Sequence, residues 1–61
     1  MTWDKGDYAA VAIAEGFEEA DSEEEAIAAW QHLIDTGLAW SLQGFFGRTA
    51  KRMIEEGVCH E

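Results

Sequence analysis

Apolar residues recur at helical spacing in two stretches of the chain. In the first stretch, one apolar face follows the i, i+3, i+4, i+7 pattern and consists of Ala26, Ile27, Trp30, Leu33 and Ile34. Ser22 with Glu25 three residues later is typical of a capping box at a helix N-terminus. Acidic residues in the first turn also suit the positive end of the helix dipole. We therefore expect a helix from Ser22 to about Asp35, ended by Gly37, with Trp30 in the core.

The second stretch, residues 38–57, is expected to form a helix that ends at Gly57. Steps of 100° per residue gather large apolar side chains on one side of it, namely Leu38, Leu42, Phe45, Phe46 and Met53. The other side carries Trp40, Gly44, Gly47, Arg48 and Lys51. Inside a helix, Gly44 and Gly47 each cost about 1 kcal/mol relative to alanine. Two interpretations stay open: either the helix breaks near GFFG, or a closely packed partner helix or ligand offsets this cost.

Residues 8–15 are expected to form a shorter N-terminal helix, because they are rich in alanine, the strongest helix former. Asp7 is the expected N-terminal cap, and Gly16 is the expected end. Val11 and Ile13 also alternate with alanine, so a short buried strand remains an alternative for this stretch. With the two longer helices, this pattern predicts an all-α fold.

The length of 61 residues allows one small domain, residues 1–61, with an acidic part over residues 1–37 and a candidate ligand-binding part over residues 38–57. A chain this short buries only about 60% of its unfolded surface, so folding alone is marginal. Trp3 is expected to be pinned to the body of the protein. Because one small core cannot cover all the aromatic side chains, we expect a homodimer. Its expected interface consists of Leu38, Leu42, Phe45 and Phe46.

The formal charge of -9 is unevenly distributed along the chain. Residues 1–37 carry ten acids against Lys5 alone, while residues 38–61 carry three acids and three bases. Such an acidic surface repels the phosphate backbone, which argues against ordinary nucleic-acid binding. Within residues 15–25 seven of eleven positions are acidic, and we interpret this run as a solvated linker and helix start. It lacks the alternating ligands and the glycine turn of a calcium loop.

The sequence offers little for metal chemistry or catalysis. Cys59 is the single cysteine, and His32 and His60 are not spaced to bind a metal with it. His32 lies off the apolar face and is expected to be exposed, while Cys59 is expected to be a packing residue. No Ser/His/Asp or Cys/His pairing is suggested, so we expect neither an enzyme nor a cofactor. A reduced cytosolic compartment is expected, with no secretory signal and no membrane span.

The cations of the second stretch differ in their neighbours. Lys51 and Arg52 have Glu55 and Glu56 four residues further on, which allows ordinary ion pairs along a helix. Arg48 has Arg52 at i+4 and Gly44 at i−4, so it has no local counter-charge. An anion from outside would complete this arrangement, and amides near Gly47 would add to it if a helix starts there.

Trp40 is the candidate flat wall beside these cations. Planar bases stack on such rings at about 1–3 kcal/mol per base. The alternative, that Trp40 packs against a second subunit, has equal weight from spacing alone. Gln43, at the edge of the same face, is a candidate for contacting the edge of a base. The candidate ligand-binding residues are Trp40, Gln43, Gly44, Gly47, Arg48 and Lys51.

Residues 33–59, LIDTGLAWSLQGFFGRTAKRMIEEGVC, resemble a small protein family of phages and prophages in which DTGLAW, LQG and FGR recur in this order. Its members are similar to compact phage sponge proteins, which form homodimers and sequester ADP-ribose-derived immune signals of TIR-based systems such as Thoeris. The resemblance implies Trp40 as a stacking surface and Arg48 as a phosphate ligand. It also implies immune evasion by binding a cyclic ADP-ribose isomer or a related nucleotide in the cytoplasm of a bacterial host.

A second hypothesis comes from the charge of -9. An acidic protein can inhibit a host nucleic-acid-binding protein by mimicking DNA. A mimic needs carboxylates spread over its surface and has no use for a tryptophan beside an arginine. The two hypotheses therefore differ in which residues matter.

Overall fold

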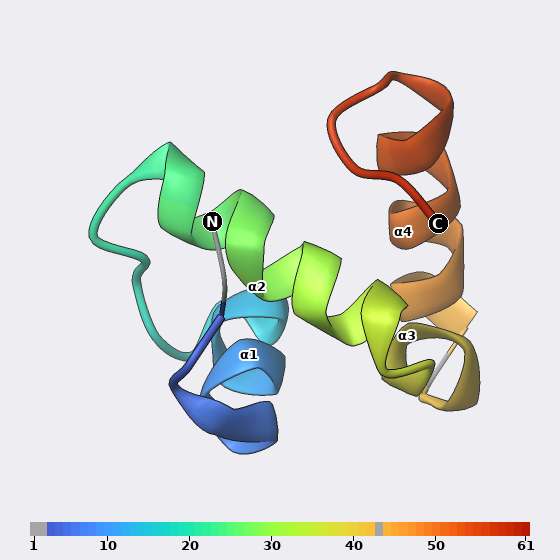
Figure 1. Cartoon of the computed structure of the whole chain (residues 1–61). Helices are drawn as coiled ribbons and strands as arrows, with labels where there is room; N and C mark the ends of the chain where they lie inside the picture. Colours follow the sequence, from blue (N-terminus) through green and yellow to red (C-terminus); the bar gives the residue numbers. More distant parts are fainter. Residues whose placement is uncertain (1–2, 43) are drawn as a thin grey trace.

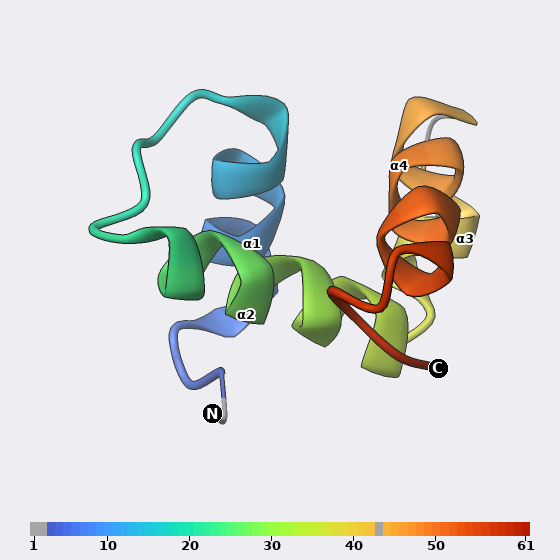
Figure 2. The ribbon, with the colours of Figure 1, turned by 90° about the horizontal axis from the view of Figure 1, so that it is seen from above.

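The computed structural model describes residues 3–42 and 44–61. The described residues form four helices, α1 (Gly6–Glu15), α2 (Glu23–Asp35), α3 (Leu38–Ser41) and α4 (Gly44–Glu55), and no strand. Figures 1 and 2 show α2 in the middle of the fold, with α1 beside its first part and α3 and α4 at its far end. The all-α prediction is confirmed.

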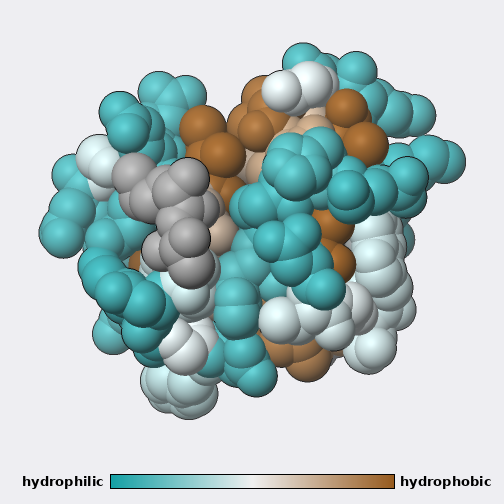
Figure 3. All heavy atoms as spheres, viewed as in Figure 1, coloured by the Kyte–Doolittle hydropathy of each residue, from teal (hydrophilic) through white to brown (hydrophobic). Residues whose placement is uncertain are grey.

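Small residues bring the helices close together around α2. Ala10, Ala29 and Ala50 are completely buried, and Leu33 is the one large side chain that is fully buried among the described residues. The rings of Trp30 and Phe46 lie 5.9 Å apart at an interplanar angle of 46°, an edge-tilted geometry that aromatic pairs favour. Trp30 is therefore a core residue, as its position in the apolar pattern predicted. Polar side chains cover most of the face in Figure 3, and apolar atoms are visible between them.

The predicted limits of α2 are confirmed. The Ser22 side chain accepts a hydrogen bond from the Glu25 amide at 3.1 Å, and Gly37 takes the left-handed conformation with φ 82° just beyond the helix. The second hydrogen bond of the capping box, which the Glu25 side chain accepts, differs from the motif. The Glu25 carboxylate accepts from the Asp21 amide at 3.1 Å, one residue before the partner that the motif predicts.

The N-terminal helix is also confirmed, which excludes the strand alternative, but its predicted cap is wrong. Lys5 occupies the N-cap position without a side-chain hydrogen bond, and Asp7 lies inside the first turn. The Asp7 carboxylate instead contacts His32 Nε2 on α2 at 2.6 Å. His32 is therefore half-buried against α1, and the expectation that it is exposed was wrong. Gly16 ends α1 as predicted, with φ 85°.

Residues 38–57 form two helices, so of the two interpretations left open for this stretch the break near GFFG is the one that holds. Leu42 is extended, with φ -85° and ψ -172°, and α4 begins at Gly44. The break comes just before Gly44. Glycine is a weak helix former, so the chain changes direction where continuing the helix is least favourable. The C-terminal end agrees with the prediction: Gly57 has φ 80°, and the Val58 amide donates to the Met53 carbonyl at 2.9 Å, as in a Schellman motif.

Most of the expected dimer interface belongs to the chain's own core. Phe46 is 2% exposed, and Leu38 and Leu42 are half-buried against the core. Phe45 stacks on Phe46 with ring centroids 4.2 Å apart and stays at the surface. Of the four residues, Phe45 is the one that is exposed.

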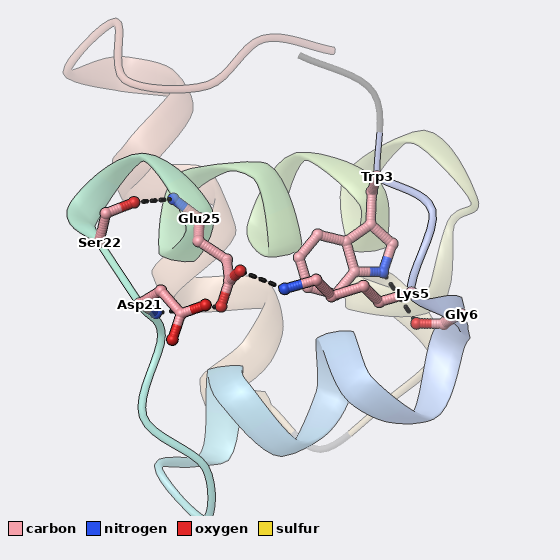
Figure 4. Close-up of polar contacts among 6 residues, drawn as sticks. All are labelled: Trp3, Lys5, Gly6, Asp21, Ser22 and Glu25. Atoms are coloured by element: carbon pink, nitrogen blue, oxygen red, sulfur yellow. Dashed lines mark hydrogen bonds and ion pairs between the residues drawn. The ribbon is translucent and has the colours of Figure 1, made fainter.

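The N-terminal segment is fastened to α2, which confirms that Trp3 is pinned (Figure 4). The Trp3 indole N–H donates to the Gly6 carbonyl at 2.8 Å. The Lys5 amino group lies 5.8 Å from the centre of the Trp3 ring and forms an ion pair with Glu25. The hydrogen bond to Lys5, followed by that from the Asp21 amide, lowers the pKa of Glu25 below its ordinary value of 4.5.

Replacement of Glu25 by glutamine is expected to lower the melting temperature at pH 7, because the ion pair with Lys5 is lost. Glu25 has a lowered pKa in the folded state, so its stabilisation is present above pH 4.5 and is lost as pH falls through the folded-state pKa. The difference in melting temperature between parent and variant should therefore disappear in acid. A difference that persists unchanged at low pH would contradict the assignment. Thermal denaturation by circular dichroism across the acid range measures it.

The C-terminal segment is held on α2 by Gln31. The Gln31 side chain accepts from the His60 amide at 3.0 Å and donates to the His60 carbonyl at 2.7 Å. Cys59, the preceding residue, is 4% exposed, which confirms it as a packing residue. Burial, and then the charge of Asp35, raise the pKa of the Cys59 thiol above its ordinary value of 9.0.

Replacement of Gln31 by alanine is expected to speed the reaction of Cys59 with a thiol reagent by about tenfold, because two hydrogen bonds that hold the segment are lost. Reaction rates under native conditions measure this. The matched control is His60→Ala, because Gln31 bonds to the backbone of His60, which alanine keeps. Equal rates in the parent and in Gln31→Ala would show that other contacts hold the segment.

Candidate functional site

Trp40 lies on α3 and packs against α4 at Gly47. Trp40 is 49% exposed. A Cβ atom added at Gly47 would lie 3.7 Å from ring carbon Cε3 of Trp40 and 3.6 Å from the Ala39 carbonyl oxygen. These are ordinary van der Waals distances, so Gly47 is close to the ring without being required by space. The helix break places Trp40 here, where a continuous helix would have placed it beside Gly44.

Arg48 folds back along α4 over Gly44. A Cβ atom added at Gly44 would lie 2.9 Å from the Arg48 Nη1 atom, so the guanidinium covers the first residue of the helix. The first amides of a helix point outward and carry a partial positive charge. A cation in this place gains nothing from the helix dipole, but both groups favour an anion. Among the described residues, Arg48 has no ion-pair partner.

Lys51 shares a hollow of about 410 Å³ with Trp40, and the hollow is also lined by Ile54, Glu55 and Glu61. The predicted ion pairs of Lys51 with Glu55 and of Arg52 with Glu56 do not form in the described part of the chain. The side chains of Lys51 and Arg52 are both exposed. An anion that enters the hollow therefore meets Lys51 together with two carboxylates.

The structure thus divides the predicted site into two groups along α4. Trp40, Gly47 and Lys51 lie together, and Gly44 lies with Arg48. Gln43, the sixth predicted residue, lies outside the described residues. Glu61 was missed by the sequence analysis. Its place in the hollow depends on how the C-terminal segment docks on Gln31, and no local sequence pattern indicates this.

Within residues 3–42 and 44–61, no three His, Cys, Asp or Glu side chains lie close enough together to hold a metal ion. None of the helices in the same ranges has the length and apolar character needed to cross a membrane.

The fold and the candidate site define a small all-helical domain with an aromatic and cationic surface on α3 and α4. The chain belongs to the family described as Domain of unknown function (DUF7417), whose model matches residues 6–61. The match covers all four helices and most of the acidic part of the chain, residues 1–37. The family description assigns no activity, ligand or partner. No curated protein and no solved structure matches the chain.

Replacement of Gly47 by alanine is expected to raise the free energy of unfolding by about 0.5–1 kcal/mol, because alanine favours the helix and its Cβ fits beside Trp40. Urea denaturation measures the change. If Gly47 also leaves room for a ligand on the Trp40 ring, the same variant should bind that ligand less tightly. A variant that is less stable than the parent would show that this glycine is required for packing.

Proposed function

We propose that this protein binds a nucleotide without changing it chemically, at the first turn of α4. The observation that carries the proposal is the pair of glycines in that turn, with the Trp40 ring beside Gly47 and the Arg48 guanidinium over Gly44. A half-exposed ring and a cation without a described partner suit a ligand that is flat at one end and anionic at the other. Neither group alone would select a nucleotide.

Each part of a nucleotide has a suitable group in this arrangement. A base would stack on Trp40 for about 1–3 kcal/mol. A phosphate would accept charge-assisted hydrogen bonds from Arg48 and bonds from the first amides of α4. Lys51 would take a second phosphate. Glu55 and Glu61, which line the same hollow, would accept hydrogen bonds from ribose hydroxyls and would disfavour a ligand that is anionic throughout.

The resemblance of residues 33–59 to phage proteins narrows the ligand to the ADP-ribose-derived class, such as a cyclic ADP-ribose isomer. In this proposal the protein acts as a sponge in the cytoplasm of a bacterial host. Evasion of the immune response follows if the protein is abundant and releases the bound nucleotide slowly. A second copy that covers the open side of the hollow would raise the affinity toward the nanomolar range, about -12 kcal/mol. The homodimer is therefore part of the same proposal.

Calorimetry with ADP-ribose, cyclic ADP-ribose isomers and cyclic dinucleotides tests the proposal, with recovery of the ligand by chromatography after the complex is heated. We expect binding of at least one ADP-ribose derivative and recovery of the intact ligand. A converted product would mean an enzyme. If no nucleotide binds, the proposal fails and the acidic-mimic hypothesis takes its place. Light scattering during size exclusion then tests the dimer separately.

A further inference from the structure

A second surface, on α1, is remote in sequence from the candidate nucleotide site. Its most exposed large apolar side chains are Tyr8, at 86%, and Phe17, at 81%. Together with four other residues they line a hollow of about 480 Å³, and the others are Val11, Ala12, Glu15 and Glu18. No other large apolar side chain of the described residues is as exposed as these two.

The backbone that carries these side chains is hydrogen-bonded in place, while the side chains themselves are open to solvent. Gly16 turns the chain in the left-handed conformation, and the Phe17 amide then donates to the Ala12 carbonyl at 3.0 Å. The Glu18 amide donates to the same carbonyl at 3.3 Å. Phe17 and Glu18 are therefore fixed at the end of α1, on the side of the helix that carries Tyr8. Exposed aromatic side chains beside a fixed backbone turn are typical of an interaction site.

The charge around the hollow indicates which kind of binding partner it favours. Glu15 and Glu18 line the hollow, and they belong to the run in which seven of eleven residues are acidic. Lys5, the single base of residues 1–37, is already paired with Glu25. A second copy that docks through the same face would place carboxylates against carboxylates, and an anionic membrane would be repelled in the same way.

We propose that this hollow binds a basic amphipathic segment of another protein, with apolar side chains between Tyr8 and Phe17 and arginine or lysine against Glu15 and Glu18. An amphipathic helix uses an apolar hollow in this way, and cations are also attracted to the faces of aromatic rings. This surface does not involve Trp40 or Arg48. Its test can therefore fail while the nucleotide proposal stands, and the reverse also holds.

Fluorescence anisotropy with a labelled synthetic helix, leucine on one face and arginine on the other, tests the proposal. Tyr8→Ser and Phe17→Ser should each weaken binding by about tenfold, and their exposure means that the fold should survive, which circular dichroism checks. The double variant Glu15→Gln/Glu18→Gln should weaken binding much more than Glu23→Gln/Glu24→Gln. Both remove two charges from the same acidic run, but only the first pair lines the hollow.

Equal weakening by the two double variants, with no effect of Tyr8→Ser or Phe17→Ser, would mean unspecific attraction of opposite charges and would overturn the proposal. Equal binding of a peptide in which glutamine replaces every arginine would overturn the claim that the partner is basic. Self-association of the parent that Tyr8→Ser and Phe17→Ser abolish, measured by sedimentation, would identify a second copy as the occupant instead. Tenfold losses confined to the residues of the hollow are the result that supports it.

Discussion

Truncation of Leu33 to alanine is expected to unfold most of the protein. Leu33 is completely buried between the helices, and removing such a side chain costs about 2–5 kcal/mol. At the usual value per residue, a domain of this size has a total free energy of unfolding of about 3–9 kcal/mol. A single cavity can therefore remove most of the stability.

Helical circular dichroism and urea denaturation measure this effect. Leu38→Ala is the matched control, because Leu38 has the same side chain but is only half-buried on α3. It should lose clearly less stability than Leu33→Ala. If both variants lose the same amount, or if Leu33→Ala melts with the parent, the core is not centred on Leu33.

Replacement of Trp40 or Arg48 by alanine is expected to weaken nucleotide binding by at least about 1.5 kcal/mol each, more than tenfold in the dissociation constant. Trp40→Ala would remove the stacking surface, and Arg48→Ala would remove the charge-assisted hydrogen bonds to phosphate. Calorimetry with the tightest ADP-ribose derivative measures the loss. Arg52→Ala is the matched control, since it removes the same charge one turn further along α4.

The control matters because removing any cation from the protein weakens the binding of an anion slightly. A loss for Arg52→Ala equal to that for Arg48→Ala would assign the effect to general charge. If Trp40→Ala and Arg48→Ala both bind as the parent does, the first turn of α4 is not the site.

The helices that carry strong local patterns were predictable from the sequence. Ser22 and Gly37 mark the ends of α2, and Gly16 marks the end of α1, because caps and left-handed glycines act through neighbouring backbone groups. A break near GFFG was one of two interpretations that the sequence left open, and the structure places it at Leu42. The apolar residues on either side of it fit one continuous helix, so periodicity alone gives no sign of the change in direction.

The sequence suggested residues for a candidate site but gave no geometry for them. Trp40 and Gly47 do come together, yet they do so because α3 folds against α4, and Arg48 is on the neighbouring glycine. Contacts between distant segments were also missed, because they depend on how the helices pack on one another. The pairing of Asp7 with His32 depends on how α1 packs on α2, and the spacing within either helix contains no information on it.

The central claim is that a nucleotide stacks on Trp40, and the indole N–H signals in a nitrogen-15 NMR spectrum test it most directly. The chain has three tryptophans, and the other two indoles, Trp3 and Trp30, belong to the fastened N-terminal segment and the core. Titration with cyclic ADP-ribose isomers and ADP-ribose should shift the Trp40 signal, assigned by its loss in Trp40→Phe, and leave the other two in place. A Trp40 signal that stays unchanged while any of these ligands binds would contradict the account.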